Sequence, residues 1–171
     1  WQFDTYPTYD TYVDMMDSFA VAFPNLCVIE NIGNSVQGRA ILYAKISDNV
    51  NIDEDEPEIL YVGTIHGDET TGYVLMLRLI SYLLNNYGTD SLATRLVDSC
   101  EIWINPLANP DGTYYGGNNS VSGARRYNAN GYDLNRNCPD PEDGQYPGGT
   151  RQIAFAEAAL DTVATSFELA R

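Results

Sequence analysis

The chain has 171 residues, of which 44% are hydrophobic and 19% are charged, and its formal net charge is −15. This length and composition are typical of one globular domain, residues 1–171, with a sizeable core. The acidic excess argues against nucleic acid and anionic membrane surfaces as partners, because both require a basic footprint.

The first part of the chain predicts a helix followed by a hairpin and a buried strand. Hydrophobic residues spaced three and four apart predict an amphipathic helix over residues 9–23. The β-rich runs 26–32 and 40–46 predict a hairpin. The acidic segment 47–57 is expected to be a solvated loop rather than a calcium site. Residues 58–65 predict a buried strand.

The next elements are two helices and a strand. Residues 70–87 are apolar almost all round, which predicts a helix that is buried on most sides and packs on a sheet. Residues 90–97 suit a short second helix, with Thr89 or Asp90 as its cap. Residues 101–104 predict another strand, which breaks at Pro106.

The last part of the chain differs from the rest in amino-acid composition. Residues 109–137 are rich in Gly, Asn, Asp and Tyr and have little periodicity, and a long irregular segment in a compact domain is usually functional or disordered. Residues 140–149 predict a second loop, and residues 153–167 predict a closing amphipathic helix.

The cysteines and the first residue of the chain give information on the cellular compartment of the protein. Cys27, Cys100 and Cys138 form neither a disulfide framework nor a cysteine zinc site, because their number is odd and their spacing wide. Cys27 and Cys100 are expected in the core. No run reaches membrane-spanning length, and no signal peptide is present. Because the chain starts at Trp1 rather than Met, we expect an exported protein, secreted or periplasmic.

His66 is the only histidine, and it stands where the strand 58–65 ends and a helix is about to begin. Glu69 follows three residues later, so an imidazole nitrogen and a carboxylate can face one ion. A histidine at a strand end is also compatible with a structural, hydrogen-bonded role. The spacing of His66 and Glu69 predicts a metal site only if other residues support it.

A second cluster supports it. Three of the nine basic residues, Arg125, Arg126 and Arg136, fall within one loop of this acidic chain, and Asn135 stands beside Arg136. Guanidinium groups suit forked recognition of a carboxylate. The alternative is a loop whose arginines only neutralise nearby acids. Together the two clusters predict an anion site next to a metal.

These residues resemble the zinc metallocarboxypeptidases, the family of carboxypeptidases A and B and of carboxypeptidases D, N and E. The resemblance is carried by His66-Gly67-Asp68-Glu69, by Asn105-Pro106 with Asn109-Pro110-Asp111-Gly112, and by Arg126 through Asp133-Leu134-Asn135-Arg136-Asn137. It covers most of the chain and leans towards the D/N/E branch. It implies an α/β fold with a mixed, mostly parallel sheet and helices on both faces, a three-layer sandwich that is incomplete at its C-terminal side.

The resemblance also implies roles for individual residues. His66 and Glu69 are expected to bind one Zn²⁺ ion, and Asp133 to hydrogen-bond the histidine and orient it. Arg126 is expected to polarise the scissile carbonyl. Asn135 and Arg136 are expected to hold the C-terminal carboxylate of a peptide or protein substrate.

One feature departs from the family. Its third zinc ligand is a histidine on a strand after the helix that here is expected over residues 153–167, and its general-base glutamate comes later still, whereas this chain has no second histidine. We therefore expect the chain alone to be inactive, as the N-terminal portion of a catalytic domain whose sheet is completed by a further segment or a second chain.

Three functions remain open at this stage. The first is a zinc metallocarboxypeptidase. The second is a zinc amidase or deacylase, or an enzyme that trims peptidoglycan peptides, since those substrates also carry carboxylates. The third is a non-catalytic module that binds carboxylates, which the single histidine favours for the chain alone.

Overall fold

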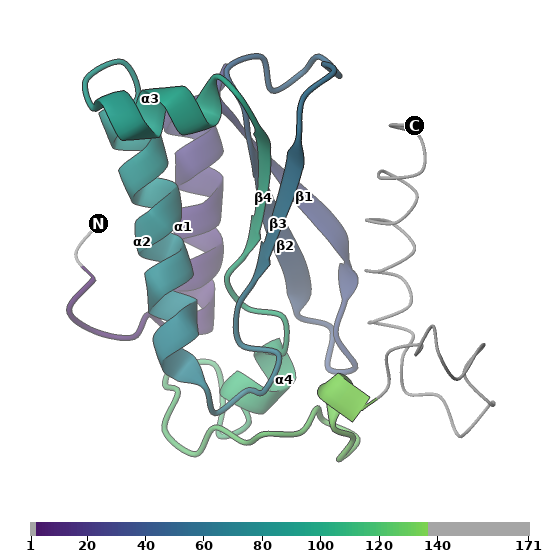
Figure 1. The fold of residues 1–171 in the computed structure, drawn as a ribbon. Helices are drawn as coiled ribbons and strands as arrows, with labels where there is room; N and C mark the ends of the chain where they lie inside the picture. The colour runs from purple at the N-terminus through teal and green to yellow at the C-terminus, as the bar shows by residue number, and fades with distance from the viewer. Residues whose placement is uncertain (1–2, 137–171) are drawn as a thin grey trace, which may run out of the picture.

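The computed structural model describes residues 3–136, which form one four-stranded sheet with two long helices packed on one face (Figure 1). The strands are β1 (Cys27–Asn34), β2 (Ala40–Ile46), β3 (Glu58–Val62) and β4 (Glu101–Asn105). The helices are α1 (Tyr9–Ala22), α2 (Thr70–Asn86), α3 (Ser91–Val97), α4 (Pro110–Thr113) and the 3₁₀ turn η1 (Leu134–Arg136).

The sheet has the strand order β1-β2-β4-β3 and is mixed. β1 and β2 form the predicted hairpin, in which Cys27 pairs with Ile46, and β2 also runs antiparallel to β4. Only β3 and β4 are parallel, because α2 and α3 form a crossover between them. The expectation of a mostly parallel sheet is therefore wrong for these four strands, since the hairpin returns β2 in the opposite direction.

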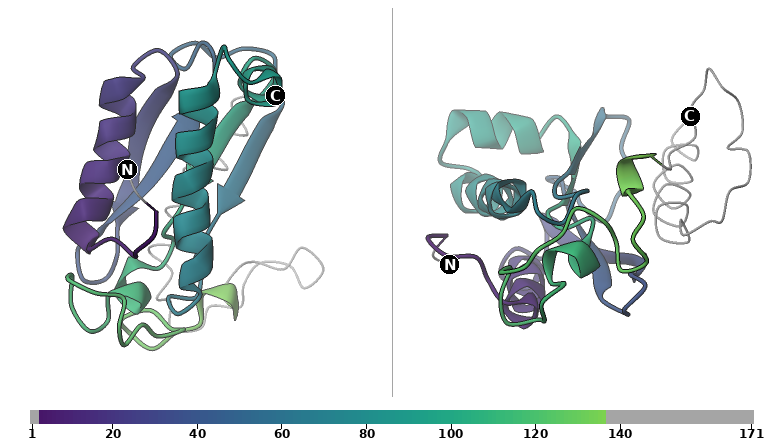
Figure 2. Two further views of the ribbon diagram at one scale, coloured as in Figure 1. Left: turned by 90° about the vertical axis from the view of Figure 1, so that its left-hand side faces the viewer. Right: turned by 90° about the horizontal axis from the view of Figure 1, so that it is seen from below.

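α1 and α2 lie side by side in front of the sheet (Figure 2). Thr8 caps α1 by accepting a hydrogen bond from the Thr11 N–H (3.1 Å), and Asp90 caps α3 in the same way. The predicted helix over residues 153–167 lies outside the described residues, as do the 140–149 loop and Cys138. Among residues 3–136, no helix combines the length and apolar character needed to cross a bilayer.

The core lies between these two helices and the sheet. Alternate residues of β2 and β4 face the helices, which is the two-residue period of a strand. α2 is less enclosed than predicted, because Leu75 is 53% exposed. Cys27 is buried as expected, whereas Cys100 is only partly buried, and both are free thiols. The buried core includes Tyr12, Met16, Phe19, Leu42, Ala44, Ile46, Tyr73, Leu77, Ile80, Leu83, Ile102 and Ile104.

A cluster of tyrosines joins the helices at one end of this core. Tyr73 of α2 and Tyr114 share a hydrogen bond between their hydroxyls (3.0 Å), and the Tyr114 hydroxyl also contacts the Pro7 carbonyl (2.9 Å). The rings of Tyr12 and Tyr9 in α1 meet these edge to face. Burial raises the pKa of Tyr114 to about 12. The cluster fixes the start of α2 against α1, at the end of the molecule where α4 and η1 also lie (Figure 1).

Candidate metal and carboxylate site

His66 lies just beyond the carboxyl end of β3, where parallel strands of α/β proteins present their functional groups. The pairing of β3 with β4 continues past Val62, because the Gly63 N–H donates to the Asn105 carbonyl (2.7 Å). α2 then starts at Thr70. His66 is 5% exposed, so its ring is held within the turn rather than projecting into solvent.

Both nitrogens of the His66 ring face carboxylates. Nδ1 is 2.8 Å from Glu69 Oε1, and Nε2 is 3.1 Å from Asp133 Oδ1. Glu69 is the N-cap residue of α2, but its carboxylate makes no cap hydrogen bond and is directed at the histidine instead. A nitrogen and a carboxylate this close need a proton or a metal cation between them. The geometry thus joins three residues that sequence analysis selected.

Asp133 also holds Arg126. Its Oδ2 accepts a hydrogen bond from Nε (2.9 Å) and forms an ion pair with one terminal nitrogen of the guanidinium (2.9 Å), while the other terminal nitrogen lies 3.3 Å from His66 Nδ1. Burial alone would raise the pKa of Asp133. The hydrogen bonds from Arg126 and His66 and from the Asn135 N–H outweigh it and hold that pKa below its ordinary value. Asp133 is therefore an ionised acceptor for both the histidine and the arginine.

Asn135 and Arg136 lie in η1 and are exposed. The Asn135 N–H donates to Asp133 Oδ1 (3.0 Å), which ties the turn to the His66 cluster. The Arg136 side chain donates to the Asn135 carbonyl (2.8 Å), and within the described part of the chain it forms no ion pair. The structure thus places both residues next to Asp133 along the chain but does not join their side chains to His66 or Glu69.

The short helix α4 packs against the turn that carries His66. The Thr113 hydroxyl donates to the Gly67 carbonyl (2.8 Å), and the Arg125 N–H donates to the Gly112 carbonyl (2.8 Å). The sequence predicted only an irregular segment from residue 109 onward, so this contact was missed. Asn109 before a proline is also a helix N-cap signal, with the proline at the first helical position, and that signal predicts α4.

An ion pair fixes α4 to the hairpin loop. Asp111 is 1% exposed, and its carboxylate accepts from Arg39 (2.7 Å), from the Ser35 hydroxyl (2.7 Å) and from the Gln37 N–H (2.9 Å). The Arg39 guanidinium also donates to the Tyr114 carbonyl (3.2 Å). The loop between β1 and β2 therefore supports the site from behind α4.

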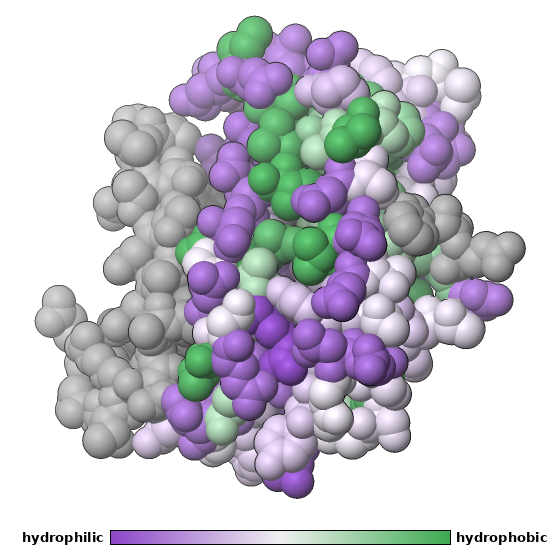
Figure 3. Space-filling view, turned by 180° about the vertical axis from the view of Figure 1, so that it is seen from behind, coloured by the Kyte–Doolittle hydropathy of each residue, from purple (hydrophilic) through white to green (hydrophobic). Residues whose placement is uncertain are grey.

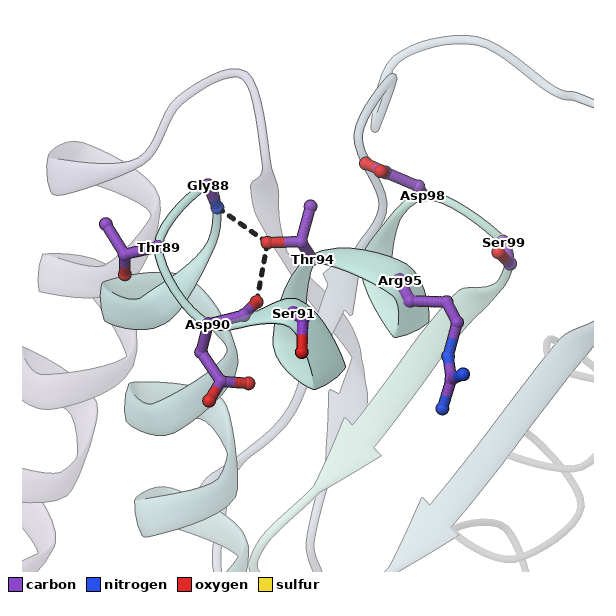
Figure 4. Close-up of a pocket in the computed structure, with 8 residues that line it drawn as sticks. All are labelled: Gly88, Thr89, Asp90, Ser91, Thr94, Arg95, Asp98 and Ser99. Atoms are coloured by element: carbon purple, nitrogen blue, oxygen red, sulfur yellow. Dashed lines mark hydrogen bonds between the residues drawn. The ribbon is translucent and has the colours of Figure 1, made fainter.

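Two hollows lie away from this site. One, of about 410 Å³, is lined by residues 88–91, 94, 95, 98 and 99 between α2 and α3, where Thr94 bonds the Gly88 N–H and the Asp90 carbonyl (Figure 4). It lies at the far end of α2 from His66, and a helix of 17 residues spans roughly 25 Å. It contains none of the residues selected from the sequence as site residues, so it suggests no chemistry.

The second hollow, of about 440 Å³, lies where β3 and β4 begin, at the opposite end of these strands from His66. Glu101 is 8% exposed there and accepts from Lys45 Nζ (2.6 Å) and from the Trp103 indole N–H (2.7 Å). Glu58 Oε2 is buried, with no hydrogen-bond partner among residues 3–136. Burial and the nearby Glu101 charge raise the pKa of Glu58.

The residues present fit part of a zinc site. Two donors of the kind zinc prefers, His66 Nδ1 and Glu69 Oε1, lie side by side, and a carboxylate holds the other ring nitrogen. Asp133 cannot bind the same ion through this contact, because it lies on the far side of the ring. Across residues 3–136, no group of three or more His, Cys, Asp or Glu side chains is arranged to hold a metal ion.

Comparison with known proteins identifies the family. The model of the zinc carboxypeptidases matches residues 12–165 of the chain. The chain belongs to the zinc carboxypeptidase family. It is 44% identical over 124 residues to carboxypeptidase D of Mus musculus, an alignment that covers 71% of this chain and 9% of that protein. It is 38% identical over 138 residues to the carboxypeptidase N catalytic chain of Mus musculus, with 77% of this chain and 30% of that protein covered.

Solved structures show the same fold. Carboxypeptidase A from Helicoverpa armigera superposes with a TM-score of 0.76 at 24% identity, over 96% of this chain and 44% of that one. Thrombin activatable fibrinolysis inhibitor superposes with a TM-score of 0.82 at 18% identity, over 96% of this chain and 45% of that one. The chain therefore spans less than half of these two solved structures and less than a third of the two curated relatives.

Proposed function

We propose that the protein to which this chain contributes is a zinc-dependent carboxypeptidase that removes residues from the C-termini of peptides or proteins. The observation that carries the proposal is the His66 ring, which is held by Asp133 on Nε2 and faces Glu69 at 2.8 Å through Nδ1. That arrangement orients an imidazole nitrogen and a carboxylate towards one position while the other nitrogen is fixed, as metal-ligating histidines require.

His66 and Glu69 would hold the ion, and zinc with an open position supplies an activated water and polarises a carbonyl. In the metal-bound protein the Nε2–H of His66 would donate to Asp133, which would leave the Nδ1 lone pair free for the metal. Asp133 thereby sets the tautomer and the ring orientation together.

Arg126 would stabilise negative charge that develops on the carbonyl oxygen of the scissile bond. Its Nε and one terminal nitrogen are bound to Asp133, so the guanidinium is held in one orientation with its other terminal nitrogen near His66. A donor that is already oriented costs little reorganisation when charge develops. Asp133 therefore serves Arg126 and His66 at once.

Asn135 and Arg136 would bind the C-terminal carboxylate of the substrate. The two residues are exposed, and the Arg136 guanidinium has no carboxylate partner among residues 3–136, so it is available to an anion. A guanidinium reads a carboxylate through two parallel hydrogen bonds, and a neighbouring amide adds a further donor. This recognition of a chain terminus would make the enzyme an exopeptidase.

We further propose that a segment or chain beyond the described residues completes the site. β3 pairs only with β4 within residues 3–136, and Tyr61 and Val62 on it are 44% and 45% exposed. A further strand on this edge would cover the unpaired backbone and would end near His66. Such a strand could carry the third zinc ligand. On this proposal the chain of 171 residues is inactive alone.

Zinc titration by calorimetry tests the site. The full-length protein is expected to bind one zinc ion tightly, and the 171-residue chain is expected to bind it far more weakly, because two protein ligands hold zinc poorly. His66→Ala should abolish binding in the full-length protein. Tight binding that survives this substitution would exclude His66 as a ligand.

Hydrolysis assays test the reaction. The zinc-loaded full-length protein is expected to release C-terminal amino acids from peptides, and a chelator should stop it. Side-by-side assays on acylamino acids and muropeptides separate the amidase and peptidoglycan-trimming alternatives. Zinc-loaded protein that leaves all three substrates intact but binds peptide C-termini would be a carboxylate-binding module.

A further inference from the structure

The side chain of Asn109 joins three segments around the site. Its Oδ1 accepts from the Gly112 N–H (2.9 Å) and caps α4, while its Nδ2 donates to the Arg126 carbonyl (3.2 Å). Its own N–H donates to the Thr64 carbonyl (3.1 Å), two residues before His66. Asn109 is 2% exposed, so water cannot replace these bonds without opening the structure.

The Arg126 backbone is seated tightly at this point. The Arg126 carbonyl oxygen accepts two hydrogen bonds. One comes from the N–H of Gly67, the residue that follows His66 (3.3 Å), and the other comes from the Asn109 amide. A Cβ on Gly112 would lie 2.7 Å from both Asn109 Nδ2 and the Arg125 carbonyl oxygen. The backbones of α4, the His66 turn and the arginine loop are therefore in direct contact, with no room for independent movement.

We propose that Asn109 is a positioning residue for Arg126: its amide holds the Arg126 main chain at the distance from His66 at which the guanidinium can serve the reaction. The inference rests on the proposed function and deepens it. An asparagine suits this position because its amide accepts from Gly112 and donates to Arg126 at the same time, whereas a carboxylate only accepts. Aspartate would cap α4 equally well but would set a carboxylate against the Arg126 carbonyl.

Asn109→Asp in the full-length protein separates positioning from folding. The cap is kept, but a buried carboxylate then faces the Arg126 carbonyl, so the melting temperature is expected to fall by a few degrees, while zinc affinity is expected to change by about twofold or less. kcat should fall by about 10- to 100-fold with little change in KM, because displaced catalytic groups lose interactions made in the transition state. A purely structural role would instead lower the melting temperature and the zinc affinity together.

The matched control is Asn128→Asp. Asn128 lies in the same loop, is 8% exposed, and uses its Oδ1 to accept from the Asn130 and Tyr132 N–H groups, both of which an aspartate can keep. It adds the same charge and should leave kcat within about twofold of the wild type. If Asn109→Asp behaves like this control while Arg126→Ala lowers kcat strongly, the inference is overturned and the function stands.

A crystal structure of the Asn109→Asp variant tests whether Asn109 positions Arg126, even if the wild-type protein has no activity. The expected result is an Arg126 guanidinium displaced from Asp133, to which its Nε donates at 2.9 Å in the present structure. An unchanged contact would overturn the inference. An inactive wild type overturns only the proposed function, so the two failures are distinguishable.

Discussion

The backbone is strained at Thr64, two residues before the candidate zinc ligand His66. Thr64 has a φ of 56° and is the one non-glycine residue with positive φ within residues 3–136. This conformation is rare for a β-branched side chain and costs about 1–3 kcal/mol. Its carbonyl accepts from Asn109 and its hydroxyl donates to the Glu69 carbonyl (3.3 Å), so neighbouring contacts hold the strained turn that delivers His66.

Thr64→Asn tests this strain. Asparagine adopts the left-handed region more readily, so the substitution is expected to raise the free energy of unfolding by about 0.5–1 kcal/mol. Thr64→Val is the matched control, since it keeps the branched shape, loses the hydroxyl and should destabilise the protein. Urea unfolding of both variants measures the difference. A Thr64→Asn protein no more stable than Thr64→Val would show that the conformation is not what limits stability here.

Gly67 is required for space rather than for an unusual backbone angle. A Cβ there would overlap the backbone of Gly112 and Thr113 and would lie 2.5 Å from the Arg125 carbonyl oxygen. Gly67→Ala is expected to cost about 3 kcal/mol and to abolish zinc binding, because α4 and the His66 turn must separate.

Gly72 provides the comparison for Gly67. It lies in α2, and a Cβ there would come no closer than 3.9 Å to Thr64. Gly72→Ala is therefore expected to be neutral or to stabilise α2 by up to about 1 kcal/mol. Thermal unfolding and zinc titration of both variants check the contrast, and equal stability of the two would refute the close packing of α4 against Gly67.

At the scale of elements, the sequence predicted what depends on local pattern. The helix expected over residues 9–23 is α1 (Tyr9–Ala22), and the one expected over residues 70–87 is α2 (Thr70–Asn86). The strand expected over residues 58–65 ends at Val62. It stops early because the chain must turn through Thr64, and a threonine gives no sign of positive φ.

What the sequence could not supply is contact between distant segments. The pairing of β2 with β4 depends on which strand edges meet in the folded chain. Because these two strands run antiparallel, the sheet is mixed rather than mostly parallel. The contact between His66 and Asp133 spans 67 positions and was expected only through the family resemblance. The support of the site by Asn109 was missed for the same reason, since periodicity carries no information on an irregular segment.

The bond between the hairpin loop and α4 yields a prediction for these elements. Asp111→Ala is expected to lower the free energy of unfolding by about 3 kcal/mol, because it leaves the Arg39 guanidinium, 11% exposed, without its counter-charge. Asp98→Ala serves as the control, since Asp98 is exposed and its carboxylate accepts a hydrogen bond from the Tyr87 hydroxyl (2.9 Å), and it should cost about 0.5 kcal/mol or less. Similar losses in urea unfolding for both variants would mean that the buried pair does not anchor α4.

Over the whole molecule, acidic groups greatly outnumber basic ones, with 24 Asp and Glu against 9 Lys and Arg. Polar side chains cover much of the surface seen from behind, around a smaller apolar patch in its upper half (Figure 3). Among residues 3–136, three of the chain's nine basic residues form ion pairs with carboxylates: Arg39 with Asp111, Lys45 with Glu101, and Arg126 with Asp133. Repulsion among the remaining acids therefore opposes the compact state, and it should depend on pH.

Glu58 is where this repulsion is easiest to measure. Burial, and then the charges of Glu101 and Asp53, raise its pKa in the folded protein, so the folded state binds the proton more tightly than the unfolded state. Stability contributed by the protonated form is present below the ordinary glutamate pKa of about 4.3 and is lost as pH rises through the folded value. At pH 7 the ionised Glu58 therefore destabilises the fold.

Glu58→Gln removes that charge and keeps the shape of the side chain. It is expected to stabilise the protein at pH 7 by roughly 0.5–1 kcal/mol, a modest figure because solvent reaches part of the side chain. The gain should shrink to nothing as pH falls below about 4, where the wild-type carboxyl is protonated in both states. Glu30→Gln, on an exposed residue of β1, is the control and should show no such pH dependence. Thermal unfolding of the three proteins between these pH values measures the difference, and a Glu58→Gln gain that persists at low pH would exclude charge as its cause.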